Sequence, residues 1–254
     1  MTATVPARRY VEHVMGMPIS LALRGRHADD ARGAAAWAAA LRGLREADRI
    51  FSTYRADSVI SRLGRAEVAL ADCPPEVAEV LALGRAAEHD SGGAFAVNRG
   101  GVLDPSGVVK GWAAERAAAH LHALPDTDFC LSAGGDITCR TLDPAAEPWR
   151  IGVEDPHDPS RLVAVVPVRT GAVATSGAAR RGAHIVDART GQPPNGIASV
   201  TVVGASLTAV DIDATAAYAR GLDAARWLST REIRSGLVVH SDGSTTIVGA
   251  RSPG

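Results

Sequence analysis

The segment Leu103–Glu115, LDPSGVVKGWAAE, joins a tight turn to a helix and carries the single lysine of the chain. Asp104-Pro105-Ser106-Gly107 has the composition of a turn. The apolar pattern from Val108 onward predicts a helix. Lys110 is therefore expected in the first helical turn, where backbone N–H groups, a glycine and an ammonium group come together.

Two interpretations of Lys110 stay open on these residues alone. The chain is rich in Ala, Gly, Arg and Val, and in such a chain a surface lysine can become arginine at little cost. A lysine that remains indicates a need for a compact ammonium on a slim stem. Beside a helix N-terminus, that ammonium suits a phosphate group. A loop-to-helix junction with a solvated lysine explains the same residues equally well.

Composition places the chain among ordinary globular proteins. It has 254 residues, of which 46% are apolar and 22% charged, enough for one large or two small domains. The net charge of −1 comes from acids and bases mixed along the chain, so nucleic acid is not an expected partner. No apolar run is long enough to predict a membrane-spanning helix.

The cysteines and the N-terminal residues bear on location. Cys73, Cys130 and Cys139 are odd in number and lack the spacing of metal ligands, which indicates free thiols in a reducing compartment. The first residues, MTATVPARRYVEH, have no apolar signal segment. We therefore expect a cytoplasmic location and no membrane partner.

Apolar periodicity predicts helices and strands mixed along the chain. Helices are expected over about 29–50, 74–89, from 108 onward, 208–221 and 222–231, with a short helical tail before residue 63. Strands are expected over 11–24, 129–131, 149–153, 162–168, 172–175 and 200–204, and a hairpin over 236–240 and 244–248.

Two polar segments hold candidate functional side chains. Tyr54 lies in the polar loop 51–63, where a tyrosine can stack on a planar ligand, although a core or rim tyrosine is the commoner case. His184 directly precedes the apolar pair Ile185-Val186, in a segment that is otherwise rich in polar groups. We favour a functional histidine here over a strand-end histidine that only bonds to the backbone.

Asp211 and Thr215 are four residues apart in the expected helix 208–221, so both side chains project from one face. A carboxylate with a hydroxyl suits Mg²⁺ bound beside substrate phosphates. The alternative is that Thr208 and Asp211 form a capping box, which only stabilises the helix start. Asp213 points elsewhere and is expected to be solvated.

Taken in order, these motifs resemble the ApbE family of FAD:protein FMN transferases, over most of the chain. The motifs are MGMP at 15–18, FSTYRADSVIS at 51–61, SGGAFA at 91–96, DPSGVVKGWAAE at 104–115, SAGGDI at 132–137, TSG at 175–177, HIVDARTG at 184–191 and VDIDATA at 210–216. The chain departs from the family pattern at Met17, Val59, Ala96, Ser132 and Ala188, and a segment usual between the third and fourth motifs is largely missing.

The resemblance implies a fold and an activity. The fold would be α+β and T-fold-like, with mixed or antiparallel sheets packed with helices, in one domain over 1–254 that has room for two closely packed subdomains. The activity would be Mg²⁺-dependent cleavage of FAD, with FMN attached by a phosphoester to a Ser or Thr of an acceptor protein and AMP released. The alternatives are hydrolysis of FAD to FMN and AMP, and flavin binding without catalysis.

Matching positions assign site residues by the same resemblance. The FAD site would be lined by Met15, Tyr54, Ala94, Phe95, Ala96, Asp104, Lys110 and Ile185. The backbone carbonyl of Gly107, with Asp211 and Thr215, would hold Mg²⁺. His184 would take the proton of the acceptor hydroxyl. Lys110, with the metal, would offset charge at the phosphorus under attack.

Overall fold

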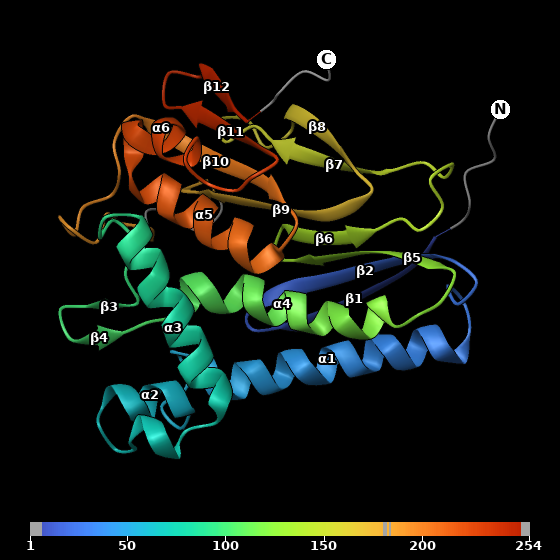
Figure 1. The fold of residues 1–254 in the computed structure, drawn as a ribbon, viewed down its shortest axis with the longest axis horizontal. Helices are drawn as coiled ribbons and strands as arrows, with labels where there is room; N and C mark the ends of the chain where they lie inside the picture. Colours follow the sequence, from blue (N-terminus) through green and yellow to red (C-terminus); the bar gives the residue numbers. More distant parts are fainter. Residues whose placement is uncertain (1–6, 180–181, 183, 250–254) are drawn as a thin grey trace.

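The computed structural model describes residues 7–179, 182 and 184–249, and its centre is one antiparallel sheet of eight strands (Figure 1). The strand order is β1-β2-β5-β6-β9-β10-β11-β12, so the N-terminal and C-terminal parts of the chain share one sheet. The strands are β1 Arg8–Val14, β2 Met17–Gly25, β5 Thr127–Ala133, β6 Asp136–Arg140, β9 Thr170–Gly177, β10 Ile197–Gly204, β11 Ser235–His240 and β12 Thr245–Val248.

Helices cover one face of this sheet, which confirms the α+β fold. Figure 1 shows α1, α4 and α5 side by side, and α1 packs on α4 as α4 packs on α5. Apolar side chains of these helices and of the sheet form the main core. The helices are α1 Ala31–Phe51, α2 Val59–Gly64, α3 Pro75–Asp90, α4 Ser106–His122, α5 Leu207–Ala219 and α6 Ala224–Leu228, with 3₁₀ turns at Leu70–Asp72 and Gly221–Asp223. No helix within the described ranges is long and apolar enough to cross a membrane.

A separate hairpin, β7 Trp149–Glu154 with β8 Leu162–Val168, covers part of the other face. Alternation along the strands sends side chains to the two faces in turn. In β9, Ala172 and Ala174 enter the main core, whereas Val173 joins a second apolar cluster with Ile151 of β7. The smallest sheet pairs β3 Asn98–Arg99 with β4 Val102–Leu103 and leads into α4. A division of the chain into subdomains stays a prediction.

The expectation of one strand over 11–24 is wrong, because this segment belongs to a hairpin. Val14 of β1 pairs with Met17 of β2, and the two-residue turn between them has positive φ at Met15 (56°) and Gly16 (69°). Such turns match the twist of antiparallel strands. β1 gave no apolar alternation because it lies at an exposed sheet edge.

Several helix starts agree with the sequence. Asp30 caps α1 through bonds from the backbone N–H groups of Arg32 and Gly33, and Ser58 caps α2. The expected helix 222–231 is shorter at both ends, because Gly221–Asp223 form a 3₁₀ turn and α6 spans only Ala224–Leu228. There the hydroxyl of Thr230 donates to a helix carbonyl and competes with further helical bonding.

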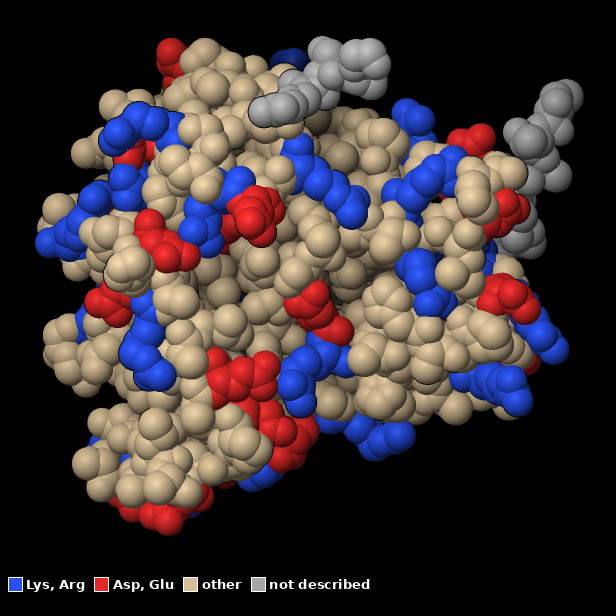
Figure 2. Space-filling view, in the orientation of Figure 1, with Lys and Arg blue, Asp and Glu red and all other residues tan. Residues whose placement is uncertain are grey.

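Charges over the face seen in Figure 2 are interspersed, with blue and red groups beside one another. This agrees with a net charge of −1 that comes from acids and bases mixed along the chain.

Candidate functional site

Two buried carboxylates and a half-buried ammonium lie together where α4, α5 and β6 meet. Lys110 of α4 contacts Asp136, the first residue of β6, and its Nζ lies 3.3 Å from Oδ1 of Asp211 in α5. Asp136 and Asp211 are 2% and 1% exposed. We call Lys110, Asp136 and Asp211 the charged triad. α4 begins at Ser106, before the expected start, so Lys110 opens its second turn rather than lying in its first.

Backbone N–H groups orient both carboxylates of the charged triad. Gly111 N–H donates to Asp211 Oδ2 at 2.9 Å, and Thr175 N–H donates to Asp136 Oδ1 at 3.0 Å. The first bond needs close contact between α4 and α5. A Cβ added at Gly111 would lie 2.8 Å from the Asp211 Cβ, so only glycine allows this approach.

The charged triad carries one negative charge in excess when all three groups are ionised. For Lys110, burial lowers the pKa, but the charges of Asp211 and Asp136 outweigh burial and raise it above its usual value. For Asp211, burial raises the pKa, the nearby Asp136 raises it further, and Lys110 opposes both. A bound cation would relieve this excess of negative charge.

The residues assigned to a metal also come together here. Thr215 Oγ1 lies 2.9 Å from Ser176 Oγ of β9. A Cβ added at Gly107 would lie 3.7 Å from the Thr215 methyl carbon, so α4 begins directly beside α5. In a regular helix the Gly111 N–H donates to the Gly107 carbonyl. The Gly111 N–H also reaches Asp211, so the turn of α4 that contains Gly107 lies against α5.

A donor set of one carboxylate, hydroxyls and a carbonyl fits a hard cation such as Mg²⁺, which keeps water and phosphate oxygens as its other ligands. Among the described residues, no group of three or more His, Cys, Asp or Glu side chains has a metal-binding arrangement. The donor chemistry of Gly107, Asp211 and Thr215 therefore fits Mg²⁺ and does not suit Zn²⁺.

The capping-box interpretation of Asp211 is wrong. The N-cap of α5 is Ser206, whose Oγ accepts from Ala209 N–H. Glu115 of α4 also binds this helix start and accepts from Thr208 N–H at 3.0 Å. Asp211 is thus free of capping and contacts Lys110 instead.

Asp213 is not solvated as expected. It is 5% exposed and accepts a bond of 3.0 Å from Nε of Arg231. Arg231 Nη1 also donates to Asp90 Oδ2 at 2.8 Å, which connects α5 to the end of α3. The position of Asp213 on the opposite side of α5 from Asp211 therefore serves helix packing.

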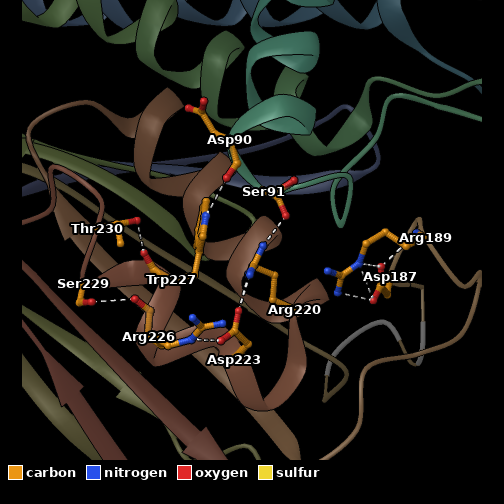
Figure 3. A network of polar contacts seen from close by, with 10 residues as sticks. All are labelled: Asp90, Ser91, Asp187, Arg189, Arg220, Asp223, Arg226, Trp227, Ser229 and Thr230. Carbon is orange, nitrogen blue, oxygen red and sulfur yellow. Dashed lines mark hydrogen bonds and ion pairs between the residues drawn. The ribbon is translucent and has the colours of Figure 1, made fainter.

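Side chains that follow α5 hold the C-terminal end of α3 (Figure 3). Arg220 donates to the Ser91 carbonyl and pairs with Asp223, and Trp227 Nε1 donates to the Asp90 carbonyl at 2.9 Å. The last carbonyls of a helix lack partners within it, so these bonds satisfy groups that would otherwise need water. We call Arg220, Trp227 and Arg231 the α3 clamp.

The α3 clamp positions the loop that holds Ala94–Ala96. The Ser91 hydroxyl accepts from Phe95 N–H at 3.0 Å, and the Ala94 carbonyl accepts from Ala188 N–H at 2.9 Å. A Cβ added at Gly107 would lie 2.9 Å from the Phe95 ring, so this ring packs against the start of α4. The loop thereby connects the end of α3, the start of α4 and the segment after residue 184.

The structure does not bring every assigned residue to the charged triad. Tyr54 is fully exposed, and His184 is exposed with its Nδ1 3.0 Å from the Gly182 carbonyl oxygen. Neither side chain forms a hydrogen bond or ion pair with the charged triad within the described residues. Residues 180, 181 and 183, beside His184, lie outside the described ranges.

The other assigned residues have structural partners. Asp104 Oδ1 accepts from Ser106 N–H at 3.0 Å and so supports the start of α4. Met15 forms the β1–β2 turn, and Ile185 packs against the main core. Ala96 is half-buried in the loop that the α3 clamp positions.

Sequence reasoning assigned no role to Asp136 or Glu115. Asp136 follows Gly134-Gly135, which form a two-residue turn between β5 and β6. A usable signal is the lone lysine itself, since a buried ammonium needs a carboxylate partner and Asp136 lies in the motif SAGGDI at 132–137.

Solved structures of other proteins have the same fold, an antiparallel sheet with helices on one face. The ApbE protein from Thermotoga maritima superposes with a TM-score of 0.85 at 20% identity, covering 96% of this chain and 97% of that one. A flavin transferase ApbE from Vibrio cholerae superposes with a TM-score of 0.79 at 22% identity, covering 95% and 97%. The fold is therefore that of the ApbE structures.

The amino-acid sequence indicates the same family of proteins as the fold does. A family model described as the ApbE family matches residues 15–103 and 96–237, and this chain belongs to that family. A curated FAD:protein FMN transferase of Vibrio cholerae is 33% identical over 130 residues, 47% of this chain and 39% of the relative. One of Rhodobacter capsulatus is 34% identical over 152 residues, 56% of this chain and 29% of the relative. The matches thus span well under half of each relative.

Proposed function

We propose that this chain is an FAD:protein FMN transferase that works with Mg²⁺. The observation that carries the proposal is the charged triad, in which Lys110 lies between Asp136 and Asp211 beside Gly107 and Thr215. Curated relatives bear this activity in their names, which supports the same chemistry here.

The start of α4 would bind the pyrophosphate of FAD. Lys110 supplies a fixed ammonium, and its two carboxylate partners prevent its deprotonation. Gly107, Asp211 and Thr215 would hold Mg²⁺, which when bound stabilises negative charge on phosphate oxygens. Because both carboxylates are already oriented by backbone bonds, little reorganisation accompanies the reaction.

His184 is the group that we assign to the acceptor hydroxyl. The Gly182 carbonyl can only accept, so the contact at Nδ1 makes this nitrogen the donor and leaves Nε2 able to take a proton. Its exposure suits a partner that arrives as a folded protein. The hydroxyl oxygen would then attack phosphorus, and AMP would leave with the pyrophosphate bond broken.

The flavin would lie over the loops around the charged triad. We assign its contacts to Met15, Tyr54, Ala94, Phe95, Ala96, Asp104 and Ile185. The partner would be a protein that presents a Ser or Thr, and the reaction would take place in the cytoplasm, where free thiols such as the three here persist.

The test is incubation with FAD, Mg²⁺ and an acceptor domain that a curated relative modifies, followed by mass spectrometry of the acceptor and measurement of AMP. We expect the acceptor to gain the mass of FMN, with equal AMP. If AMP appeared without that mass gain, the reaction would be FAD hydrolysis. If neither AMP nor the mass gain appeared, flavin binding without catalysis would be the remaining alternative. A His184→Ala variant is the control, because it should keep FAD binding and lose transfer.

A further inference from the structure

Two cysteines lie directly opposite each other on neighbouring strands. Cys130 of β5 pairs with Cys139 of β6 in the antiparallel register. Cys139 belongs to the second apolar cluster and the partly buried Cys130 packs against it, on the face that the β7–β8 hairpin covers. The charged triad lies on the helix-covered face, so the two thiols have no part in the proposed transfer.

The turn between β5 and β6 determines whether the backbones of Cys130 and Cys139 hydrogen-bond to each other. Gly134 and Gly135, with φ of 60° and 105°, form a two-residue turn closed by Ala133 and Asp136. The pair that closes such a turn exchanges backbone hydrogen bonds, and bonded and non-bonded pairs then alternate along the strands. Counting outward from the turn, Cys130 and Cys139 form a non-hydrogen-bonded pair.

This position suits a covalent bond between the sulfur atoms. Opposed residues of a non-hydrogen-bonded pair have Cα atoms roughly 4.5 Å apart and their side chains on one face. Disulfides span Cα separations of about 4.4–6.8 Å. We propose that Cys130 and Cys139 are a thiol modification site that closes to a disulfide when a low-molecular-weight disulfide is the oxidant.

The reaction is two thiol–disulfide exchanges. The Cys130 thiolate, the more exposed of the two, attacks one sulfur of the small disulfide and releases a thiolate. The Cys139 thiolate then attacks the Cys130 sulfur of the mixed disulfide and releases the second small thiolate. The two cysteines lose two electrons, the oxidant gains them, and the two thiol protons finish on the two released thiols.

The exchange should be slow at neutral pH. Burial raises the pKa of both thiols to about 12, so little thiolate is present. Cys139 is also 1% exposed and its thiol donates toward the Val168 carbonyl oxygen. Mildly alkaline pH raises the thiolate fraction, and a long incubation gives the slow exchange time to finish.

The experiment uses the full chain and cystamine as the oxidant. After incubation the protein is denatured, its remaining thiols are alkylated with a maleimide, and the intact mass is measured. The reduced chain should take three adducts, one for each cysteine. The oxidised chain should take no adduct, because Cys130 and Cys139 are joined to each other and the unpaired Cys73 carries one cysteamine as a mixed disulfide. Peptide mapping should find Cys130 joined to Cys139.

Two variants serve as matched controls. Cys73→Ser keeps the pair, so its oxidised form should take no adduct. Cys130→Ser cannot close the bond, so no disulfide should join two of its cysteines. Melting adds a second measure, because a closed loop restricts the unfolded chain and the oxidised parent should melt a few degrees above the reduced one. Three adducts, a lasting mixed disulfide at Cys130, or a disulfide that joins Cys73 to Cys130 or Cys139 in the parent would each overturn the proposal.

Discussion

The two sides of the candidate site are built in different ways. On the α4–α5 side, Asp136 and Asp211 are almost fully buried, and each carboxylate has both an ammonium and a backbone N–H partner. On the loop side, Tyr54 is fully exposed and His184 bonds only to a nearby carbonyl among the described contacts. The charged groups of the α4–α5 side are held in place before any ligand binds, whereas the loop side is open to large ligands.

The difference has a physical cause. A buried charge is stable only with partners, so the charged triad must be complete before any substrate arrives. An exposed loop carries no such requirement, and its side chains can gain their contacts on binding. Substitutions on the two sides should therefore differ in kind: loss of rate on one side and loss of affinity on the other.

The largest effect is expected at Asp211. Asp211→Asn keeps the shape and can still accept from Gly111 N–H, but it removes the charge that would hold Mg²⁺. AMP release should fall by about 10²–10³-fold, as when other electrostatic stabilisers of a transition state are removed. Thr215→Ala should shift the Mg²⁺ dependence in the same direction, and Thr215→Ser, which keeps the hydroxyl, is its control. Identical Mg²⁺ curves for parent and variants would place the metal elsewhere.

Lys110→Arg should be the next most severe change. A planar guanidinium is wider than the ammonium that fits between two buried carboxylates, so we expect turnover to fall by at least about tenfold. Arg116→Lys, on the exposed side of α4, is the matched control and should leave turnover unchanged. Near-parent AMP release by Lys110→Arg would refute the need for an ammonium at this position.

A smaller effect should come from the α3 clamp. Arg220→Met removes the bond to the Ser91 carbonyl and loosens the loop that carries Phe95, so FAD affinity should fall several-fold with little change in kcat. Arg226→Met is a close control, because Arg226 pairs with the same Asp223 but is exposed. Flavin fluorescence measures binding, and equal affinities for the two variants would show that the clamp only stabilises the fold.

The smallest effect is expected at Tyr54. Tyr54→Ala should weaken FAD binding a few-fold through loss of ring stacking, and Tyr54→Phe should keep it. Melting temperature should stay constant in both variants, since the side chain packs against nothing that folding buries. FAD binding by Tyr54→Ala as tight as that of the parent would remove this residue from the flavin site.

Local signals were readable from the sequence, and long-range ones were not. The helix expected over about 29–50 and the hairpin β11–β12 follow from residues that are neighbours in the chain. The sequence indicates that a buried Lys110 needs a carboxylate but not which one, because the sheet order brings Asp136 and Asp211 to it from distant segments. Asp213 was misjudged for the same reason, since Arg231 reaches it only after the chain has turned past α6.

The bond from Glu115 to the start of α5 has a consequence for how the protein opens. Glu115 accepts from the Ser206 hydroxyl across 91 residues of chain, so the first turn of α5 is complete only when α4 is docked. The two helices should then exchange their amide hydrogens as one cooperative unit rather than fray one by one. A protein built this way cannot lose the Asp211 side of its site by local melting, since opening it requires opening the helix that carries Lys110 as well.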